Sequence, residues 1–166
     1  MLDKRKFYIN GKWVSPSKEN DLEVINPSNE DPFAIISLGL KEDTDLAVHS
    51  AKKAFETWKE TSKEERIVLL EKLLEIYKKR YGEMVDAISM EMGAPLDWSS
   101  DAQTASGQSH LEDFILRLKN FKFDEHFNSK SNNHICYEPI GVCGLITPWN
   151  WPINQIALKV IPALAT

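Results

Sequence analysis

The chain has little cysteine, no excess of basic residues and no long apolar run, and each shortage excludes a class of protein. Two cysteines, Cys136 and Cys143, occur in 166 residues, so a disulfide scaffold is unsupported and two reduced thiols are expected. The net charge of -5 disfavours nucleic acid as a partner, because phosphate binding needs a basic surface. Without a spanning apolar run or a signal-peptide core we expect no membrane partner and a cytoplasmic location.

Groupings of metal-ligating or nucleophilic residues are also scarce. His49 and His110 stand on expected helices without a second ligand at zinc spacing, so the sequence predicts no metal site. Cys143 falls on an expected buried strand and is interpreted as a small core residue, since a reactive thiol needs electropositive, partly exposed surroundings. His134 and Cys136, two apart on one strand face, are interpreted as an accidental pair.

The first part of the chain carries turn and strand signals. Asn10 and Gly11 are the favoured type I′ turn pair, because both positions accept positive φ, and aromatic and β-branched residues flank them. Residues 7–14 are therefore predicted to form a short hairpin. Short apolar runs predict strands at 22–25 and 34–38.

Apolar residues at helical spacing fill the middle of the chain. Ser62 and Glu65 match the capping box, in which each side chain satisfies the other's free backbone amide. The predicted helices run from Asp43 or Thr44 to Trp58, from Ser62 to a stop at Gly93 and Pro95, and from about Ser99 to Lys119.

The stretch EPIGVCGLITPWNWP, residues 138–152, carries the chemistry. It predicts a buried strand over 142–147, a Pro-bounded corner, and an apolar helix over 153–165 that Pro162 should kink or end. Ligands of α/β sheets bind outside the carboxyl ends of strands, where a helix N-terminus adds backbone donors. The amide of Asn150 at this corner could stabilise an oxyanion, or it could brace the corner.

The stretch EPIGVCGLITPWNWPINQIALKVIPALA closely resembles the aldehyde dehydrogenase superfamily, whose segment reads much like EPxGVxGxIxPWNFP. The resemblance covers most of the chain, because FYINGKWV, VINPSNE, AVHSAKKAFETW and EMGAP also occur in family order. It implies an α/β fold, namely the N-terminal part of a Rossmann-like cofactor-binding domain with an N-terminal β-hairpin and a β-ribbon oligomerisation segment.

The resemblance also implies site residues. Asn150 matches the family asparagine that donates its amide to the oxyanion of the tetrahedral intermediates. Ile146, Thr147, Pro148 and Trp149 match the strand end beside the nicotinamide nucleotide, NAD or NADP. Trp151 stands where phenylalanine is commoner in the family; we expect the corner to tolerate this larger aromatic ring and the nearby substrate tunnel to be narrower.

The organisation implied by the resemblance has three parts: cofactor-binding domain over 1–120, oligomerisation ribbon over 121–139, and a return to the cofactor-binding domain over 140–166. The implied reaction oxidises a small-molecule aldehyde to a carboxylic acid through a Cys thiohemiacetal, in a homodimer or homotetramer. The family's nucleophilic Cys, its Glu base and its Gly-rich dinucleotide loop lie later than these residues. We therefore expect a fragment without turnover of its own; the alternatives are a non-catalytic fragment acting in subunit association and a helical binding module.

Overall fold

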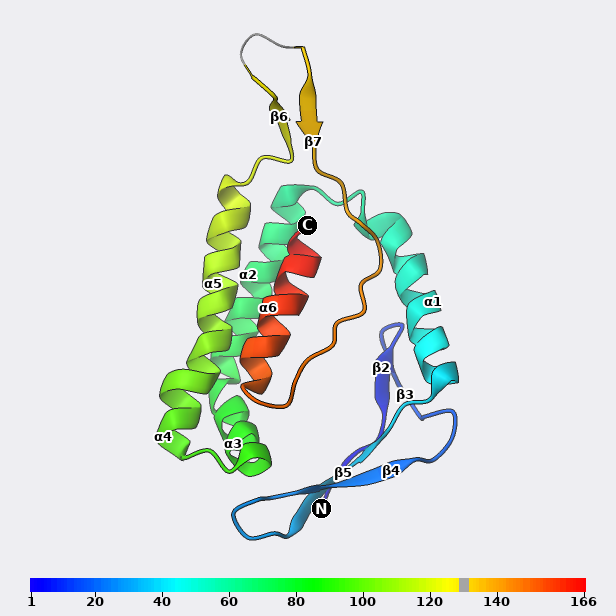
Figure 1. Cartoon of the computed structure of the whole chain (residues 1–166), viewed down its shortest axis with the longest axis vertical. Coiled ribbons are helices and arrows are strands. Elements are labelled where there is room, and N and C mark those ends of the chain that lie inside the picture. The colour runs from blue at the N-terminus through cyan, green and yellow to red at the C-terminus, as the bar shows by residue number, and fades with distance from the viewer. Residues whose placement is uncertain (129–131) are drawn as a thin grey trace.

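The structure is a computed structural model that describes residues 1–128 and 132–166. Three long helices pack side by side, a small sheet and a hairpin lie at the N-terminal end, and a two-stranded ribbon projects away from the helices (Figure 1). The mixture of helices and small sheets agrees with the predicted α/β class.

The N-terminal residues form one sheet and one hairpin. The sheet has the order β1-β5-β4, with β1 (Leu2–Lys4) parallel and β4 (Asp21–Ile25) antiparallel to β5 (Pro32–Ser37). The hairpin joins β2 (Phe7–Ile9) to β3 (Lys12–Val14). Positive φ at Asn10 (52°) and Gly11 (72°) confirms the predicted turn. The sequence did not reveal β1, because its three residues carry two charges and no apolar alternation.

The predicted first two helices are present, with one break. Helix α1 (Lys41–Trp58) precedes α2 (Lys63–Lys79), and the capping box at α2 is confirmed, since Ser62 N donates to Glu65 Oε2 at 2.7 Å. The predicted continuous helix to Gly93 was wrong at Arg80, whose φ of -103° and ψ of 16° separate α2 from α3 (Tyr81–Met92).

The third predicted helix is divided into three consecutive helical segments in the structure. A short α4 (Leu96–Trp98) leads into a π-helix η1 (Ser99–Thr104) and then α5 (Ala105–Asn120). Tyrosine hydroxyls from the neighbouring helices bond carbonyls of the π-helix: Tyr77 donates to Thr104 O at 2.8 Å and Tyr81 to Ser100 O at 2.6 Å. The two tyrosine hydroxyls thus provide hydrogen-bond donors to backbone carbonyls in a segment whose own hydrogen bonds do not follow the α-helical pattern.

The core lies between α2, α5 and the last helix, α6 (Pro152–Ala165). Its fully buried members recur at helical spacing on α5 and α6, while α2 contributes Leu70. They are Leu70, Leu111, Ile115, Leu118, Ala157, Ile161 and Ala165. Helix α6 continues through Pro162 to Ala165, so Pro162 does not end it.

The predicted ribbon is present at the far end of the helices. Strand β6 (Asp124–His126) pairs antiparallel with β7 (His134–Cys136). Residues 129–131 of the predicted 121–139 ribbon lie outside the described residues. The ribbon extends beyond the ends of α2 and α5 (Figure 1).

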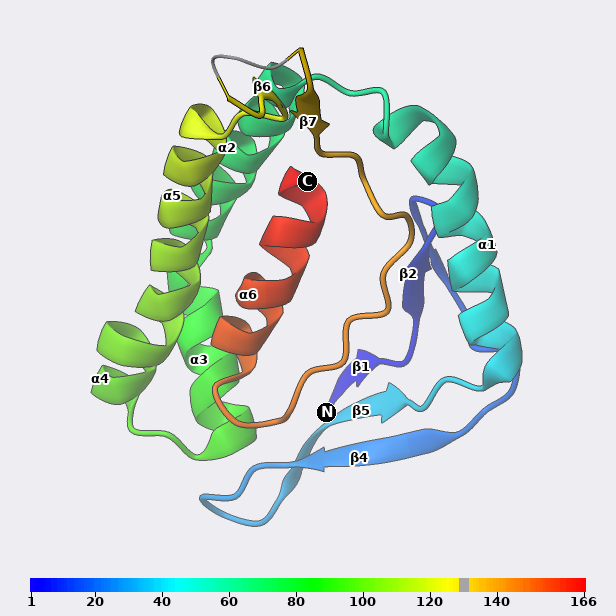
Figure 2. The same ribbon diagram turned by 45° about the horizontal axis from the view of Figure 1, so that its top comes forward.

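The predicted buried strand over 142–147 was wrong for this chain. The segment runs as an extended trace between α6 and α1, seen in both views (Figures 1 and 2), and no strand is formed there. Ile140 is 92% and Ile146 89% exposed. A strand requires a neighbour to complete its backbone ladder, and no described residue makes a backbone hydrogen bond to residues 142–147.

Candidate functional site

Asn150 lies at a sharp corner between the extended segment and α6. The next residue, Trp151, is the N-cap of α6 and has φ 52° and ψ 55°, the left-handed region. Asn150 is exposed, and within the described ranges its side chain has no hydrogen-bond partner. Its amide is therefore free to donate to a ligand.

The first turn of α6 is held by contacts from two other segments. The ring of Trp151 meets the ring of Trp98 edge-on, with centroids 5.8 Å apart and planes at 74°. The imidazole Nε2 of His110, on α5, lies 2.7 Å from Asn154 Oδ1. Sequence reasoning missed both contacts, and treated His110 only as a possible metal ligand.

Ile146, Thr147, Pro148 and Trp149 form the run that leads into the corner. All four are exposed, with Trp149 at 81%. Exposed, mostly apolar side chains thus lie directly before Asn150 in the chain. A flat aromatic ring or ribose could pack against such a surface.

Arg66 anchors the opposite end of α6. It is buried, and its guanidinium donates to the carbonyls of Thr166 at 2.6 Å and Ala165 at 3.3 Å. The guanidinium also lies 5.9 Å from the ring centroids of Trp58 and Phe123. A cation there complements the negative end of the helix dipole, while burial lowers the pKa of Arg66. The sequence offered one signal for this buried arginine: Arg66 lies four residues before Leu70, on the apolar face of α2.

The two thiols are exposed, so the interpretation of Cys143 as a core residue was wrong in this chain. His134 and Cys136 are less independent than expected, because both contact Asp124: His134 Nδ1 at 2.7 Å and Cys136 Sγ at 3.4 Å. The carboxylate raises the pKa of the Cys136 thiol, which disfavours the thiolate that a nucleophile needs. No group of three His, Cys, Asp or Glu arranged to hold a metal occurs among residues 1–128 and 132–166.

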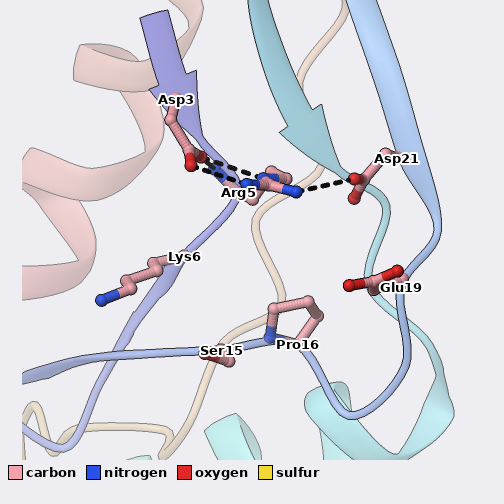
Figure 3. A pocket seen from close by; sticks show the side chains of 7 residues that line it. All are labelled: Asp3, Arg5, Lys6, Ser15, Pro16, Glu19 and Asp21. Carbon is pink, nitrogen blue, oxygen red and sulfur yellow. Dashed lines mark hydrogen bonds and ion pairs between the residues drawn. The ribbon is translucent and has the colours of Figure 1, made fainter.

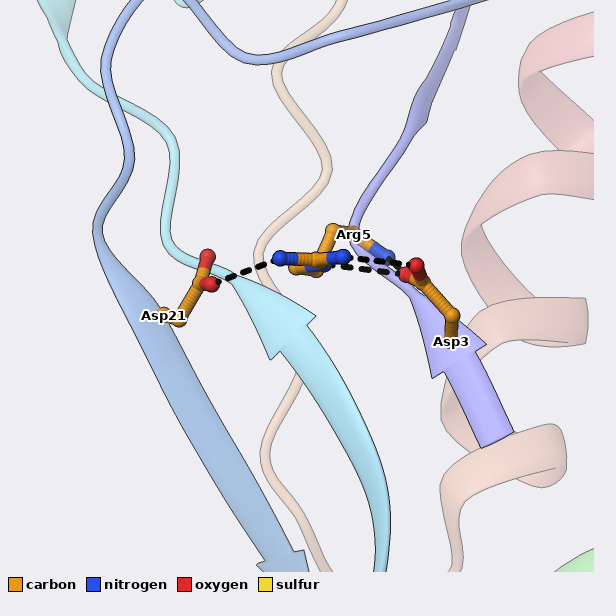
Figure 4. Close-up of polar contacts among 3 residues, drawn as sticks. All are labelled: Asp3, Arg5 and Asp21. Atoms are coloured by element: carbon orange, nitrogen blue, oxygen red, sulfur yellow. Dashed lines mark hydrogen bonds and ion pairs between the residues drawn. The ribbon is translucent and has the colours of Figure 1, made fainter. Parts of the chain in front are cut away.

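A separate polar cavity of about 280 Å³ lies at the N-terminal sheet (Figure 3). Arg5 spans it, donating to Asp3 Oδ2 at 2.8 Å and to Asp21 Oδ2 at 3.2 Å (Figure 4). These bonds to Arg5 lower the pKa of Asp3 to about 2. Because the guanidinium is paired with both carboxylates, this cluster of three residues ties β1 to β4.

The hairpin, the helical layer and the corner before α6 define the N-terminal segment of an α/β, Rossmann-like dehydrogenase domain. The family model described as "Aldehyde dehydrogenase family" matches residues 13–166, so the chain belongs to the aldehyde dehydrogenase family. Similar proteins include a 3-succinoylsemialdehyde-pyridine dehydrogenase of a Pseudomonas species, 46% identical over 99% of this chain and 34% of its own length.

Solved structures of aldehyde dehydrogenases match the fold of this chain. The aldehyde dehydrogenase of Bartonella henselae is 56% identical, with a TM-score of 0.97 over 99% of this chain and 35% of that one. A mutant of aldehyde dehydrogenase C from Pseudomonas syringae, complexed with NAD+ and octanal, is 38% identical, with a TM-score of 0.93 over 97% of this chain and 33% of that one. The chain thus spans about a third of the length of the relatives it matches. Among its described helices, none is long and apolar enough to cross a bilayer.

Proposed function

We propose that this chain is the N-terminal part of an NAD- or NADP-dependent aldehyde dehydrogenase that oxidises an aldehyde to a carboxylic acid. The observation that carries the proposal is the exposed, unpaired amide of Asn150 at the left-handed corner before α6. Family membership supplies the class of reaction.

In the proposed reaction, Asn150 stabilises negative charge. A Cys thiolate from the remainder of the protein adds to the aldehyde carbon, and the carbonyl oxygen becomes an oxyanion. Asn150 Nδ2 donates to that oxygen, which it can do without first breaking a bond in the described part of the chain. Addition of the thiolate splits one difficult oxidation into two easier steps.

Residues 146–149 are proposed as one wall of the cofactor site. Ile146, Pro148 and Trp149 offer apolar surface, and Thr147 offers a hydroxyl. When bound, the nicotinamide accepts a hydride from the substrate. The NAD+ and octanal bound to the Pseudomonas syringae relative support a nicotinamide nucleotide and a small-molecule aldehyde as ligands.

The organisation of the whole protein is part of the proposal. Residues 1–120 and 140–166 belong to the cofactor-binding domain, and 121–139 form a ribbon that joins subunits into a homodimer or homotetramer in the cytoplasm. The projection of the ribbon away from the helices supports this assignment (Figure 1), since a protruding strand pair exposes backbone that another chain can pair with.

The experiment is a chimera in which residues 1–166 replace the matching third of the Bartonella henselae enzyme. We expect formation of reduced nicotinamide from an aldehyde, and no turnover by residues 1–166 alone. Asn150→Ala should lower kcat by roughly 10²- to 10³-fold, the usual effect of removing one oxyanion donor. Asn29→Ala, in the exposed β4–β5 turn, is the matched control and should leave kcat unchanged. An inactive chimera, or an Asn150→Ala variant with full kcat, contradicts the proposal.

A second candidate function is association of the chain with other subunits, without catalysis. The observation in its favour is the exposed apolar segment at 140–149, which lacks a described strand partner. Co-elution of residues 1–166 with complete chimeric subunits in size-exclusion chromatography tests it. Separate elution excludes this candidate.

A further inference from the structure

The side chain of Asn150 has no described partner, so only the backbone at the corner fixes the direction of its Cα–Cβ bond and the region that its amide can reach. Trp151 directly after it is a non-glycine residue in the left-handed region. Such a conformation costs about 1–3 kcal/mol and persists only where the surroundings enforce it. The corner therefore depends on what holds the first turn of α6.

Among the described residues, contacts from Trp98, Gly107 and His110 hold that turn. Trp98 packs edge-on against Trp151, and Ile153 lies so close to Gly107 that a Cβ there would stand 2.8 Å from Ile153 Cγ1. The third contact is the 2.7 Å hydrogen bond between His110 and Asn154. The first two are apolar contacts, which have little directional preference, whereas a hydrogen bond holds one atom against another in a preferred direction.

The bond from His110 fixes the rotation of α6 at the level of the corner. Asn154 lies in the first turn of α6, four residues after Asn150, and both its side chain and that of His110 are partly buried. His110 belongs to α5, which is packed into the core through Leu111 and Ile115. The bond thus links the corner to the most buried part of the molecule.

We propose that His110 is a positioning residue for Asn150: by donating from Nε2 to Asn154 Oδ1, it holds the left-handed corner in the orientation that aims the Asn150 amide. This rests on the proposed function of Asn150. Glutamine can place a donor near the position of the imidazole Nε2, whereas asparagine reaches only to the position of Nδ1. Substituting His110 by glutamine and by asparagine therefore tests whether the hydrogen bond to Asn154 is needed, or only a polar side chain at position 110.

The experiment uses the active chimera, with kcat and KM measured for aldehyde and nucleotide. His110→Phe should lower kcat about tenfold with little change in KM for the nucleotide, because a displacement on the order of 1 Å at a reacting group costs up to about a hundredfold. His110→Gln should restore kcat to within about threefold of the parent, and His110→Asn should not. Asn154→Leu should match His110→Phe, and the double variant should be no worse than either.

Making His110→Phe in two backgrounds, with and without Asn150, distinguishes a positioning role of His110 from a purely structural one. In an Asn150→Ala chimera, His110→Phe should have no further effect on kcat, since no amide remains to be aimed. An equal loss in both backgrounds overturns the proposal, as does a His110→Phe chimera with parental kcat. Failure of the proposed function gives a different result: the unmodified chimera is inactive, or Asn150→Ala alone has no effect.

Discussion

The hydroxyl of Tyr77 occupies the space that any side chain at Gly107 would need. A Cβ at Gly107 would stand 2.5 Å from Tyr77 Oη and 2.8 Å from Ile153 Cγ1. The same hydroxyl donates to Thr104 O, so it cannot move away without breaking that bond. Helices α2, α5 and α6 meet at this point, which makes Gly107 a condition of their close packing.

We predict that Gly107→Ala lowers the free energy of unfolding by about 1–3 kcal/mol, the usual cost of overpacking. Urea denaturation of the chain measures it. Gly82→Ala is the matched control: a Cβ there meets nothing within 4 Å, and alanine should be neutral or stabilising by about 0.5–1 kcal/mol in a helix. Equal effects of the two substitutions would contradict the packing argument.

Acid should weaken the junction between the N-terminal loop and α1 through Asp43. Its carboxylate accepts the backbone N–H of Leu40 and both the N–H and hydroxyl of Ser17. These bonds, led by that from Leu40, hold the pKa of Asp43 below its ordinary value of 3.8. A lowered folded-state pKa contributes stability that is complete above the unfolded-state value and is lost as the pH falls through the folded-state value.

The expected result is that Asp43→Asn lowers the melting temperature at neutral pH and that this difference shrinks below about pH 4. Asp45→Asn is the control, because Asp45 is exposed and its ion pair with Lys41 is a surface pair of little energetic value. Thermal unfolding monitored by circular dichroism across this range decides the matter. A difference that stays constant down to acid pH would show that Asp43 acts by packing alone.

The sequence predicts structure correctly where residues close together in the chain stabilise it without contacts from distant residues. Asn10 and Gly11 determine their turn, and Ser62 and Glu65 cap their helix through bonds within four residues. The break at Arg80 was not predicted, because the apolar stripe continues through it. The hydroxyls of Tyr77 and Tyr81, on either side of the break, donate to carbonyls of η1, which lies more than 15 residues away in the sequence. At the candidate site, the motif proposes Asn150 and residues 146–149, and these assignments stay predictions, whereas the bond between His110 and Asn154 joins residues 44 apart.

Arg66 should be essential for docking α6, because it caps the helix with a buried charge. Arg66→Met keeps the length of the side chain and removes the donors to Ala165 O and Thr166 O, and also those to Thr61 Oγ1 and Trp58 O in the α1–α2 connection. We predict a loss of about 2–3 kcal/mol, since each lost bond involves a charged group and leaves carbonyls without that donor. Arg66→Lys should recover only part of it, because one ammonium cannot replace a planar fork. Arg117→Met, which removes an exposed pair with Asp113, is the control for loss of a cation, and urea denaturation is the measurement.

The extended segment over 142–147 should change state when the rest of a dehydrogenase is present. It carries Val142, Leu145 and Ile146, a composition typical of a buried strand, yet in this chain it is exposed and makes no described ladder. An apolar segment without neighbours leaves both its side chains and its backbone amides in water, so we expect it to form a strand only where other strands pair with it. We predict that these amides exchange with deuterium within seconds in residues 1–166 alone and are strongly protected in the chimera, while amides of α5 are protected in both. Fast exchange of the segment in an active chimera would show that it forms no strand there, and that the corner at Asn150 is supported by α6 and its contacts alone.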